Sequence, residues 1–391
     1  MNKSNRLEIV GILSLSLILT ASFSVSSCLP GMMETFKGYS LASLELVMTL
    51  PAISMTVVIA ISSILSKYIN ERVMIVSGLL IYGISGITPV FLSSCPVLFV
   101  CRILMGVGTG LINAKAVSLI GERFTGSLQQ KLQGIRCSME TLGQATLTLI
   151  VGFLLPYGWK YSFSIYGVAF VILFMYLLFV PTSKNVAVES TTKTATSYKI
   201  TAPMWRFIIG SGALGMLFIS SAMLNTLRVT SFIVDIGAGT DVHGATILSI
   251  STFAGFLGGF LFGPLIGTFK KYMLPFSTAM LGLGILIIVW FPNLIGIAAG
   301  ASISSFFITN CTSYVFSQLS EHLPTEALVT ANSIVLVGCN LGSSSTAFVL
   351  QVVGKFIPGL SAGFVVYGLL LLLVALGMLT KTFLNSKKSL N

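Results

Sequence analysis

Long apolar runs separated by short polar connections fill most of the chain. Allowing about 20 apolar residues for each membrane pass, this pattern predicts an all-α membrane protein with twelve membrane-spanning helices. Six are expected before the middle of the chain, at 9–29, 42–66, 73–94, 96–121, 131–156 and 161–181. Six more are expected after it, at 203–228, 241–268, 272–291, 293–318, 325–353 and 358–383.

A polar stretch at 182–202, rich in Ser, Thr and Lys, divides the two sets of spans and is predicted to be a flexible cytoplasmic linker. Residues 1–181 and 203–391 are then two domains. Weak similarity at an offset of about 200 residues relates them, since 139–143 corresponds to 338–342 and 63–67 to 263–267. We therefore expect two pseudo-symmetric bundles of six helices.

The composition excludes a soluble protein, because 54% of the residues are hydrophobic and 8% are charged, against about a quarter charged in a soluble domain. The net charge of +11 does not predict nucleic-acid binding, because the basic residues are scattered singly between apolar runs. Such scattering is typical of loops beside anionic lipid.

The distribution of the basic residues predicts the orientation in the membrane. The connections on one side carry Lys3, Arg6, Lys67, Arg72, Arg123, Lys131, Lys184, Lys193, Lys199, Arg206, Lys270, Lys271, Lys381, Lys387 and Lys388. The opposite connections carry only Lys37, Lys160, Arg228 and Lys355. By the positive-inside rule, both termini lie in the cytoplasm of a multi-pass cell-membrane protein. The apolar run Ile9 to Cys28 is too long for the core of a signal peptide and is expected to be an uncleaved first helix.

No motif in the sequence indicates an enzyme. The six cysteines form no Cys-x-x-Cys pair and no metal-binding spacing, and the two histidines do not form a metal site. There is no nucleophile motif, phosphate loop or cluster of His and carboxylate residues. We expect no cofactor and no bound metal.

An arginine lies inside the apolar run from Pro96 to Ile120. A charge at membrane depth costs several kcal/mol, so Arg102 is expected to face protein or water rather than lipid. Gly106 and Gly110 follow it on the same helix face, with Gly108 between them, and small residues at this spacing let another helix come close. The stretch is either a packing face with one buried arginine or a gating element, and the spacing favours neither.

This Arg-x-x-x-Gly-x-Gly-x-Gly stretch in a fourth span resembles the fourth-helix signature of the major facilitator superfamily, especially its drug/proton antiporter branch. The stretch from Gly158 to Phe163 is similar to the superfamily's Gly-Trp-Arg-x-x-Phe. The resemblance implies twelve spans in two halves, around a central cavity that opens to one side at a time. Two features depart from it, because Lys67 replaces the usual Asp after span two and span five has no proline before Pro156.

Glu140 is the main candidate for a proton-coupling group. It lies about 10 residues into the fifth predicted span, on the order of 15 Å from its cytoplasmic end. Arg136 lies one turn earlier, and Lys115 lies at a similar depth on span four. Burial and neighbouring cations together set the proton affinity of a carboxylate, so such a group can be tuned to exchange protons. A static ion-pair cluster between helices is an equally good interpretation.

The resemblance implies that spans one, four, seven and ten line the cavity. The residues selected there as substrate contacts are Asn113, Asn225, Asn310, Phe23, Phe218 and Phe306. The three amides are the preferred candidates, because a buried amide needs partners. A mostly apolar wall with a few polar points suits an amphipathic organic solute.

The predicted function is secondary active transport by alternating access, with proton-coupled export of a hydrophobic or amphipathic small molecule as the leading hypothesis. Uptake or exchange of a small organic anion is an alternative, favoured by the cations Arg102, Lys115 and Arg136. A lipid-handling flippase is another. The expected partners are a small-molecule substrate, protons and the lipid bilayer, with no nucleic acid, and we expect a monomer.

Overall fold

The computed structural model describes residues 3–92, 94–123, 126–180 and 201–388, and this part of the chain is helical, with no β-strand. The elements in chain order are α1 (Lys3–Ser14), η1 (Leu15–Ile18), η2 (Ala21–Cys28), α2 (Leu29–Thr35), α3 (Leu41–Tyr68), α4 (Glu71–Phe91), α5 (Cys95–Arg123), α6 (Gly126–Leu154), η3 (Leu155–Tyr157), η4 (Tyr161–Gly167), α7 (Val168–Phe179), α8 (Ala202–Asp235), α9 (Asp241–Phe269), η5 (Lys270–Tyr272), α10 (Met273–Trp290), α11 (Leu294–His322), α12 (Thr325–Phe356) and α13 (Ser361–Lys388). Most of the predicted linker lies outside these residues.

The described residues form eleven helical stretches that are long and apolar enough to cross a membrane, which confirms a multi-pass all-helical membrane protein. One stretch, Asp241–Trp290, is 50 residues long and contains α9, η5 and α10. The other ten each correspond to one of the predicted spans.

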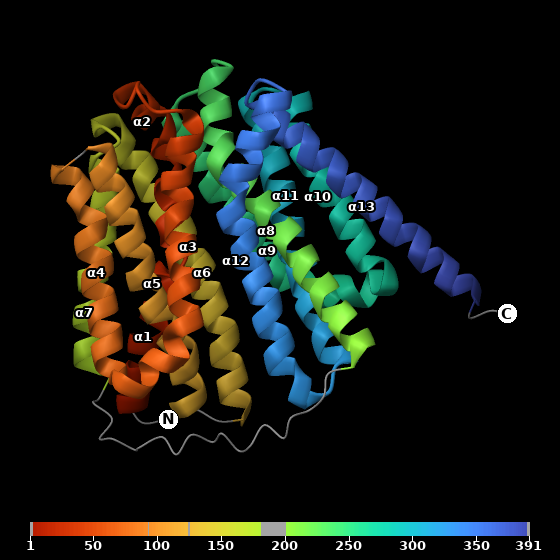
Figure 1. Ribbon diagram of the computed structural model, residues 1–391, viewed down its shortest axis with the longest axis horizontal. Coiled ribbons are helices and arrows are strands. Elements are labelled where there is room, and N and C mark those ends of the chain that lie inside the picture. The colour runs from red at the N-terminus through yellow and green to blue at the C-terminus, as the bar shows by residue number, and fades with distance from the viewer. Residues whose placement is uncertain (1–2, 93, 124–125, 181–200, 389–391) are drawn as a thin grey trace.

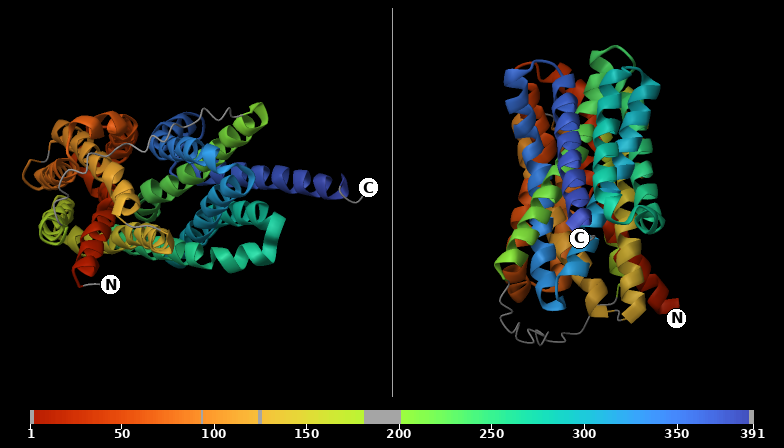
Figure 2. Two further views of the ribbon diagram at one scale, coloured as in Figure 1. Left: turned by 90° about the horizontal axis from the view of Figure 1, so that it is seen from below. Right: turned by 90° about the vertical axis from the view of Figure 1, so that its right-hand side faces the viewer.

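The long helices run side by side, with those from α1 to α7 on the left of Figure 1 and those from α8 to α13 on the right. Two pairs of helices join the left and right groups, since α6 packs against α9 and α3 packs against α12. Figure 2 shows that α13 leaves the body of the molecule at an angle. We call the end of the molecule that carries α2 the upper end, and the end that carries the N-terminus the lower end.

The first span is not the single regular helix that the sequence predicts. It is built from α1, η1, η2 and α2, with eight residues of 3₁₀ helix at Ala21–Cys28. Ser and Thr side chains compete with the backbone for hydrogen bonds, and this stretch contains four Ser and directly follows Thr20. Two of these side chains bond to α6 instead, since Thr20 Oγ1 donates to the carbonyl of Glu140 at 3.0 Å and Ser24 Oγ to that of Gln144 at 3.3 Å.

The glycines after Arg102 pack α5 against two neighbouring helices. A Cβ on Gly106 would lie 2.3 Å from the Pro51 carbonyl oxygen of α3, and one on Gly108 would lie 2.7 Å from the Gly78 carbonyl oxygen of α4. Gly110 approaches α3 at Val58. The glycines therefore serve helix packing on both sides of α5, as small residues do in membranes.

One glycine contact occurs twice and follows the sequence repeat. A Cβ on Gly143 of α6 would lie 2.0 Å from the Leu17 carbonyl oxygen, and one on Gly342 of α12 would lie 2.2 Å from the Met216 carbonyl oxygen of α8. Residue 143 corresponds to 342 and residue 17 to 216, an offset of 199 in both cases. The contact between α6 and the first span in one group of helices thus matches the contact between α12 and α8 in the other.

Candidate functional site

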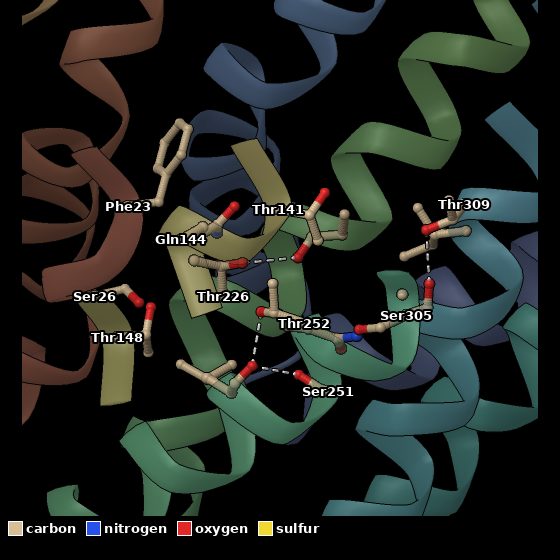
Figure 3. Close-up of a pocket in the computed structure, with 15 residues that line it drawn as sticks. Phe23, Ser26, Thr141, Gln144, Thr148, Thr226, Ser251, Thr252, Ser305 and Thr309 are labelled. Carbon is tan, nitrogen blue, oxygen red and sulfur yellow. Dashed lines mark hydrogen bonds between the residues drawn. The ribbon is translucent and has the colours of Figure 1, made fainter. Parts of the chain in front are cut away.

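A cavity of about 180 Å³ lies between the left and right groups of helices. Its wall comes from η2 and α6 on one side and from α8, α9 and α11 on the other, as Figure 3 shows. The lining residues are Phe23, Ser26, Thr141, Gln144, Thr148, Ala222, Asn225, Thr226, Leu248, Ser251, Thr252, Gly255, Ser305, Ile308 and Thr309.

The wall of this cavity is more polar than the sequence analysis expected. Ten of the fifteen lining residues carry a hydroxyl or an amide, and none of the fifteen is ionisable. Phe23 is the one aromatic residue among them. Sequence analysis missed most of the hydroxyl residues, because Ser and Thr are common throughout these helices and their hydroxyls often bond within their own helix.

Asn225 on α8 is the predicted amide that lines the cavity. Its side chain is 3% exposed, and its Nδ2 donates to Ser304 Oγ of α11 at 2.7 Å. Its Oδ1 has no hydrogen-bond partner among the described residues. A buried carbonyl oxygen without a partner is costly, and this atom is enclosed by protein rather than exposed to the cavity.

The other residues predicted to contact substrate lie in different surroundings. Phe23 lines the cavity. Asn310 is fully buried, and its Nδ2 donates to the Phe306 carbonyl of its own helix at 2.9 Å. Phe218 is also fully buried, and neither it, Phe306, Asn310 nor the half-buried Asn113 is among the lining residues. Their contact with substrate stays a prediction.

Glu140 forms an ion pair with Arg136, one turn away on α6. Both side chains are partly exposed, at 22% for Glu140 and 14% for Arg136. Lys115 is half-buried on α5 and has an interaction partner of its own. Glu140 directly precedes Thr141 in the sequence, and Thr141 lines the cavity. The structure therefore brings two of the three predicted charges together.

Arg102 occupies a buried cage without a carboxylate. Its side chain is 1% exposed, and its Nη1 donates to the Ser22 carbonyl of η2 at 3.0 Å and contacts the Tyr166 hydroxyl at 3.2 Å. The guanidinium lies 5.0 Å from the centre of the Phe163 ring, at cation–π distance. No described acidic residue forms an ion pair with it. Arg102 thus ties α5 to the irregular first span and is closed off from the cavity.

A buried ion pair that the sequence analysis missed joins the two groups of helices. Glu45, near the start of α3, is fully buried, and Arg228, near the end of α8, is 7% exposed. The guanidinium faces both carboxylate oxygens, with Arg228 Nη2 donating to Glu45 Oε2 at 3.3 Å. The available signal was two opposite charges at the same end of the second and seventh spans, but the sequence analysis placed Arg228 in a connection and did not select Glu45.

The upper ends of the two groups are in close contact around this pair. Here α2 and η2 pack against α8, and η2 and η3 pack against α9. Below them, Ser249 Oγ of α9 donates to the Ala145 carbonyl of α6 at 2.6 Å. Asn225 lies one helical turn below Arg228 on α8, so the ion pair and these contacts separate the cavity from the upper face.

A second charge cluster ties the lower end of the left group together. Arg123 at the end of α5 pairs with Glu8 of α1, and its Nη2 lies 3.1 Å from Glu71 Oε1 of α4. Burial by itself lowers the pKa of Arg123. The hydrogen bond with Glu8 and the charges of both carboxylates raise it by more, so the net pKa is above its usual value. Arg123 therefore stays charged and holds three helices at one point.

The helices of this chain are apolar and enclose a polar cavity, and a buried ion pair closes one end of that cavity. These features are typical of multi-pass membrane proteins with an internal solute site. The model of the Major Facilitator Superfamily matches residues 11–347, and the chain belongs to this family. A search of curated proteins found no significant match.

Solved structures of transporters share the fold over nearly the full length. The chain is similar to a D-xylose-proton symporter, with a TM-score of 0.76 and 16% identity over 96% of this chain and 97% of that one. It is similar to the nucleoside transporter NupG, with a TM-score of 0.73 and 14% identity over 96% and 100%. A POT family transporter in complex with 5-aminolevulinic acid gives a TM-score of 0.78 and 13% identity over 97% and 96%.

Proposed function

We propose that this protein is a secondary active transporter that carries a small molecule through the central cavity by alternating access. The observation that supports this proposal is the position of the cavity. It lies between two groups of helices and is separated from the upper face by the Glu45–Arg228 pair. Breaking that pair would let the upper ends part, while the helix pairs α6–α9 and α3–α12 keep the groups together.

We further propose twelve passes in two pseudo-symmetric bundles, 1–181 and 203–391, joined by a cytoplasmic linker at 182–202. A stretch of 50 helical residues spans about 75 Å at 1.5 Å per residue, more than twice the thickness of a hydrocarbon core, which favours two passes in Asp241–Trp290. The repeated contact of Gly143 and Gly342 supports the pseudo-symmetry. The protein then lies in the cell membrane with its lower end facing the cytoplasm. We propose that it acts as a monomer.

Protons are the proposed coupling ion, with Glu140 as the titrating group. The pair with Arg136 is accessible to water and lies next to the cavity wall at Thr141. Lys115 completes the charge cluster in this proposal. A proton on Glu140 would release Arg136, and this local change in charge would favour one arrangement of the two bundles over the other.

The polar wall bears on the choice of solute. Export of a hydrophobic or amphipathic compound by the antiporter branch depended on a mostly apolar wall, and ten polar residues in that wall favour a more polar solute. Uptake of an organic anion was favoured by the cations Arg102, Lys115 and Arg136. Of these, Arg102 is enclosed by protein and Arg136 is paired with Glu140. The titles of similar structures name a sugar symporter and a nucleoside transporter, which is consistent with transport of a polar solute.

Access to the cavity from each face tests alternating access without knowledge of the substrate. Ser26→Cys, in a cysteine-free background, places a single thiol on the cavity wall. In sealed vesicles, an impermeant maleimide is applied from one face at a time. Glu45→Gln should raise the rate of labelling from the upper face roughly tenfold or more and lower the rate from the lower face, since breaking a buried ion pair costs about 3–5 kcal/mol.

Glu34→Gln is the matched control, because Glu34 is an exposed carboxylate on α2 at the same end. It should leave both labelling rates unchanged. If Glu45→Gln raises both rates together, the protein is a channel rather than an alternating-access transporter. If the maleimide labels residue 26 from neither face, the central cavity is not part of the transport pathway.

A further inference from the structure

We infer that the central cavity binds a small uncharged solute that bears several hydroxyl or amide groups. This inference rests on the proposed transport function and specifies its substrate class. It follows from the hydrogen-bonding state of the lining side chains and from the absence of charge among them.

Several lining hydroxyls already use their one O–H group within their own helix. Thr226 Oγ1 donates to the Ala222 carbonyl at 3.2 Å, and Thr252 Oγ1 donates to the Leu248 carbonyl at 2.7 Å. Ser251 and Thr309 donate in the same way, at 2.9 and 3.2 Å. A hydroxyl has one donor and two acceptor lone pairs, so these four oxygens remain acceptors. A solute with O–H or N–H groups satisfies them.

Other lining side chains have no hydrogen-bond partner among the described residues, and these are Ser26, Gln144, Thr148 and Ser305. Figure 3 shows Ser26 and Thr148 on one side of the cavity and Ser305 on the other. Three hydroxyls and one amide supply both donors and acceptors. A bound solute therefore meets hydrogen-bonding groups from both groups of helices.

The charges described around the cavity are paired with an opposite charge or enclosed by protein. Glu140 pairs with Arg136 on its own helix, and Arg102 is 1% exposed within its cage. None of the fifteen described lining residues is ionisable. An ionic solute would lose its hydration without gaining an opposite charge, which is strongly unfavourable. The cavity therefore favours an uncharged solute over an organic anion or cation.

A lipophilic solute is disfavoured by the same side chains. It would displace water from the ten polar residues without replacing their hydrogen bonds, and it would find one aromatic ring, Phe23. A site built to hydrogen-bond a solute strongly rejects an analogue that lacks the matching groups. The wall thus discriminates by hydrogen bonding rather than by apolar contact.

Ligand stabilisation of the purified full-length protein tests this inference. The probes are four fractions of a small-molecule extract of the source cells: a neutral hydrophilic, an anionic and a cationic fraction from ion exchange, and a lipophilic fraction from organic solvent. The readout is the thermal unfolding midpoint, since a molecule that binds the folded state raises it. The neutral hydrophilic fraction should stabilise the protein, and the other three should not.

Two wall variants and one control locate the effect. Gln144→Leu and Thr148→Val remove polar groups from the wall and should each raise the half-saturating amount of the neutral fraction about three- to tenfold, the usual effect of one lost hydrogen bond. Thr278→Val removes a fully buried hydroxyl of α10 outside the cavity and should leave this amount unchanged. Gln144→Leu and Thr148→Val should also reduce uptake of the neutral fraction into proteoliposomes, whereas Thr278→Val should not.

Each outcome decides the inference. Stabilisation by a charged or lipophilic fraction alone, by no fraction, or by a neutral fraction whose effect the wall variants leave unchanged would overturn it. The transport proposal fails separately, because the labelling of Ser26→Cys from the two faces depends on no substrate. A transporter that passes the labelling test and binds only a charged fraction keeps its function and loses this substrate class.

Discussion

At the scale of single residues, Arg102 has different surroundings from the Arg136–Glu140 pair. Arg102 is enclosed by carbonyl, hydroxyl and aromatic groups, whereas Arg136 pairs with Glu140 in a partly exposed position. A carboxylate that water reaches beside a solute cavity is accessible to protons, whereas Arg102 is enclosed by protein. Glu140 is therefore the residue through which the proposed proton coupling is best tested.

We expect Glu140→Gln to abolish pH-driven accumulation of substrate while exchange down a concentration gradient continues. Gln keeps the shape of the side chain and removes the titration. Because both side chains of the pair are partly exposed, water can solvate Arg136 in the variant, and we expect a loss of stability of about 1–3 kcal/mol. Transport in proteoliposomes with and without a pH gradient, together with thermal unfolding, measures both effects.

Glu34→Gln is a control for the loss of one negative charge and should leave coupling intact, because Glu34 is exposed at the upper end. A purely structural pair predicts the opposite balance, with low folded yield and unchanged coupling in the protein that does fold. A well-folded Glu140→Gln protein that still accumulates substrate under a pH gradient would end the proton-carrier hypothesis.

At the scale of the elements, the first span and its glycine contacts organise each group of helices. The 3₁₀ segment η2 presents the Ser22 carbonyl to Arg102 and places Phe23 and Ser26 on the cavity wall. A 3₁₀ stretch inside a helical span often marks a functional hinge. Gly143 fixes α6 against this span near η1, and Gly342 makes the equivalent contact in the other group.

Substitution of these glycines tests the packing. Gly143→Ala and Gly342→Ala should each lower the thermal unfolding midpoint, because the added methyl would lie 2.0 and 2.2 Å from backbone oxygens that cannot rotate away. Overpacking of this kind costs about 1–3 kcal/mol. The measurement is thermal unfolding of the purified variants in detergent.

Gly210→Ala is the matched control, since Gly210 lies in α8 with no atom within 4 Å of an added Cβ. It should leave the midpoint unchanged or raise it, because Ala has the higher helix propensity. Equal losses at all three positions would mean that the close contacts at Gly143 and Gly342 contribute nothing specific.

At the scale of the whole molecule, the orientation in the membrane decides which face the ion pair closes. The excess of Lys and Arg lies on the connections of the lower end, which predicts that this end is cytoplasmic. The Glu45–Arg228 pair then closes the outer face. The arrangement described here corresponds to the outward-closed half of the proposed transport cycle.

The orientation is tested by labelling Ser190→Cys in a cysteine-free background. Residue 190 belongs to the predicted linker, outside the described residues, and should react with a membrane-permeant maleimide only. Gly38→Cys provides the complementary site, because Gly38 is exposed in the connection at the upper end and should react with an impermeant maleimide. Reaction of residue 190 with the impermeant reagent in intact cells would reverse the orientation and assign the closed face to the cytoplasm.

The sequence by itself determined that the chain is an all-helical, multi-pass membrane protein, because runs of about 20 apolar residues have few other stable solutions. It also identified the family from local motifs around Arg102, since small residues and a buried charge leave a pattern within one helix. Glu140 and Arg136 were paired correctly because they lie four residues apart, where helix geometry alone brings side chains together.

Only the tertiary structure decided what lines the cavity and what closes it. Glu45 and Arg228 are 183 residues apart, and only the tertiary arrangement brings the start of α3 to the end of α8. Thr148 and Ser251 look like ordinary helix residues in the sequence, and the crossing of five helices places them on one polar wall. Local periodicity records which face of a helix is apolar, whereas a site between helices depends on which faces meet, and long-range packing sets that.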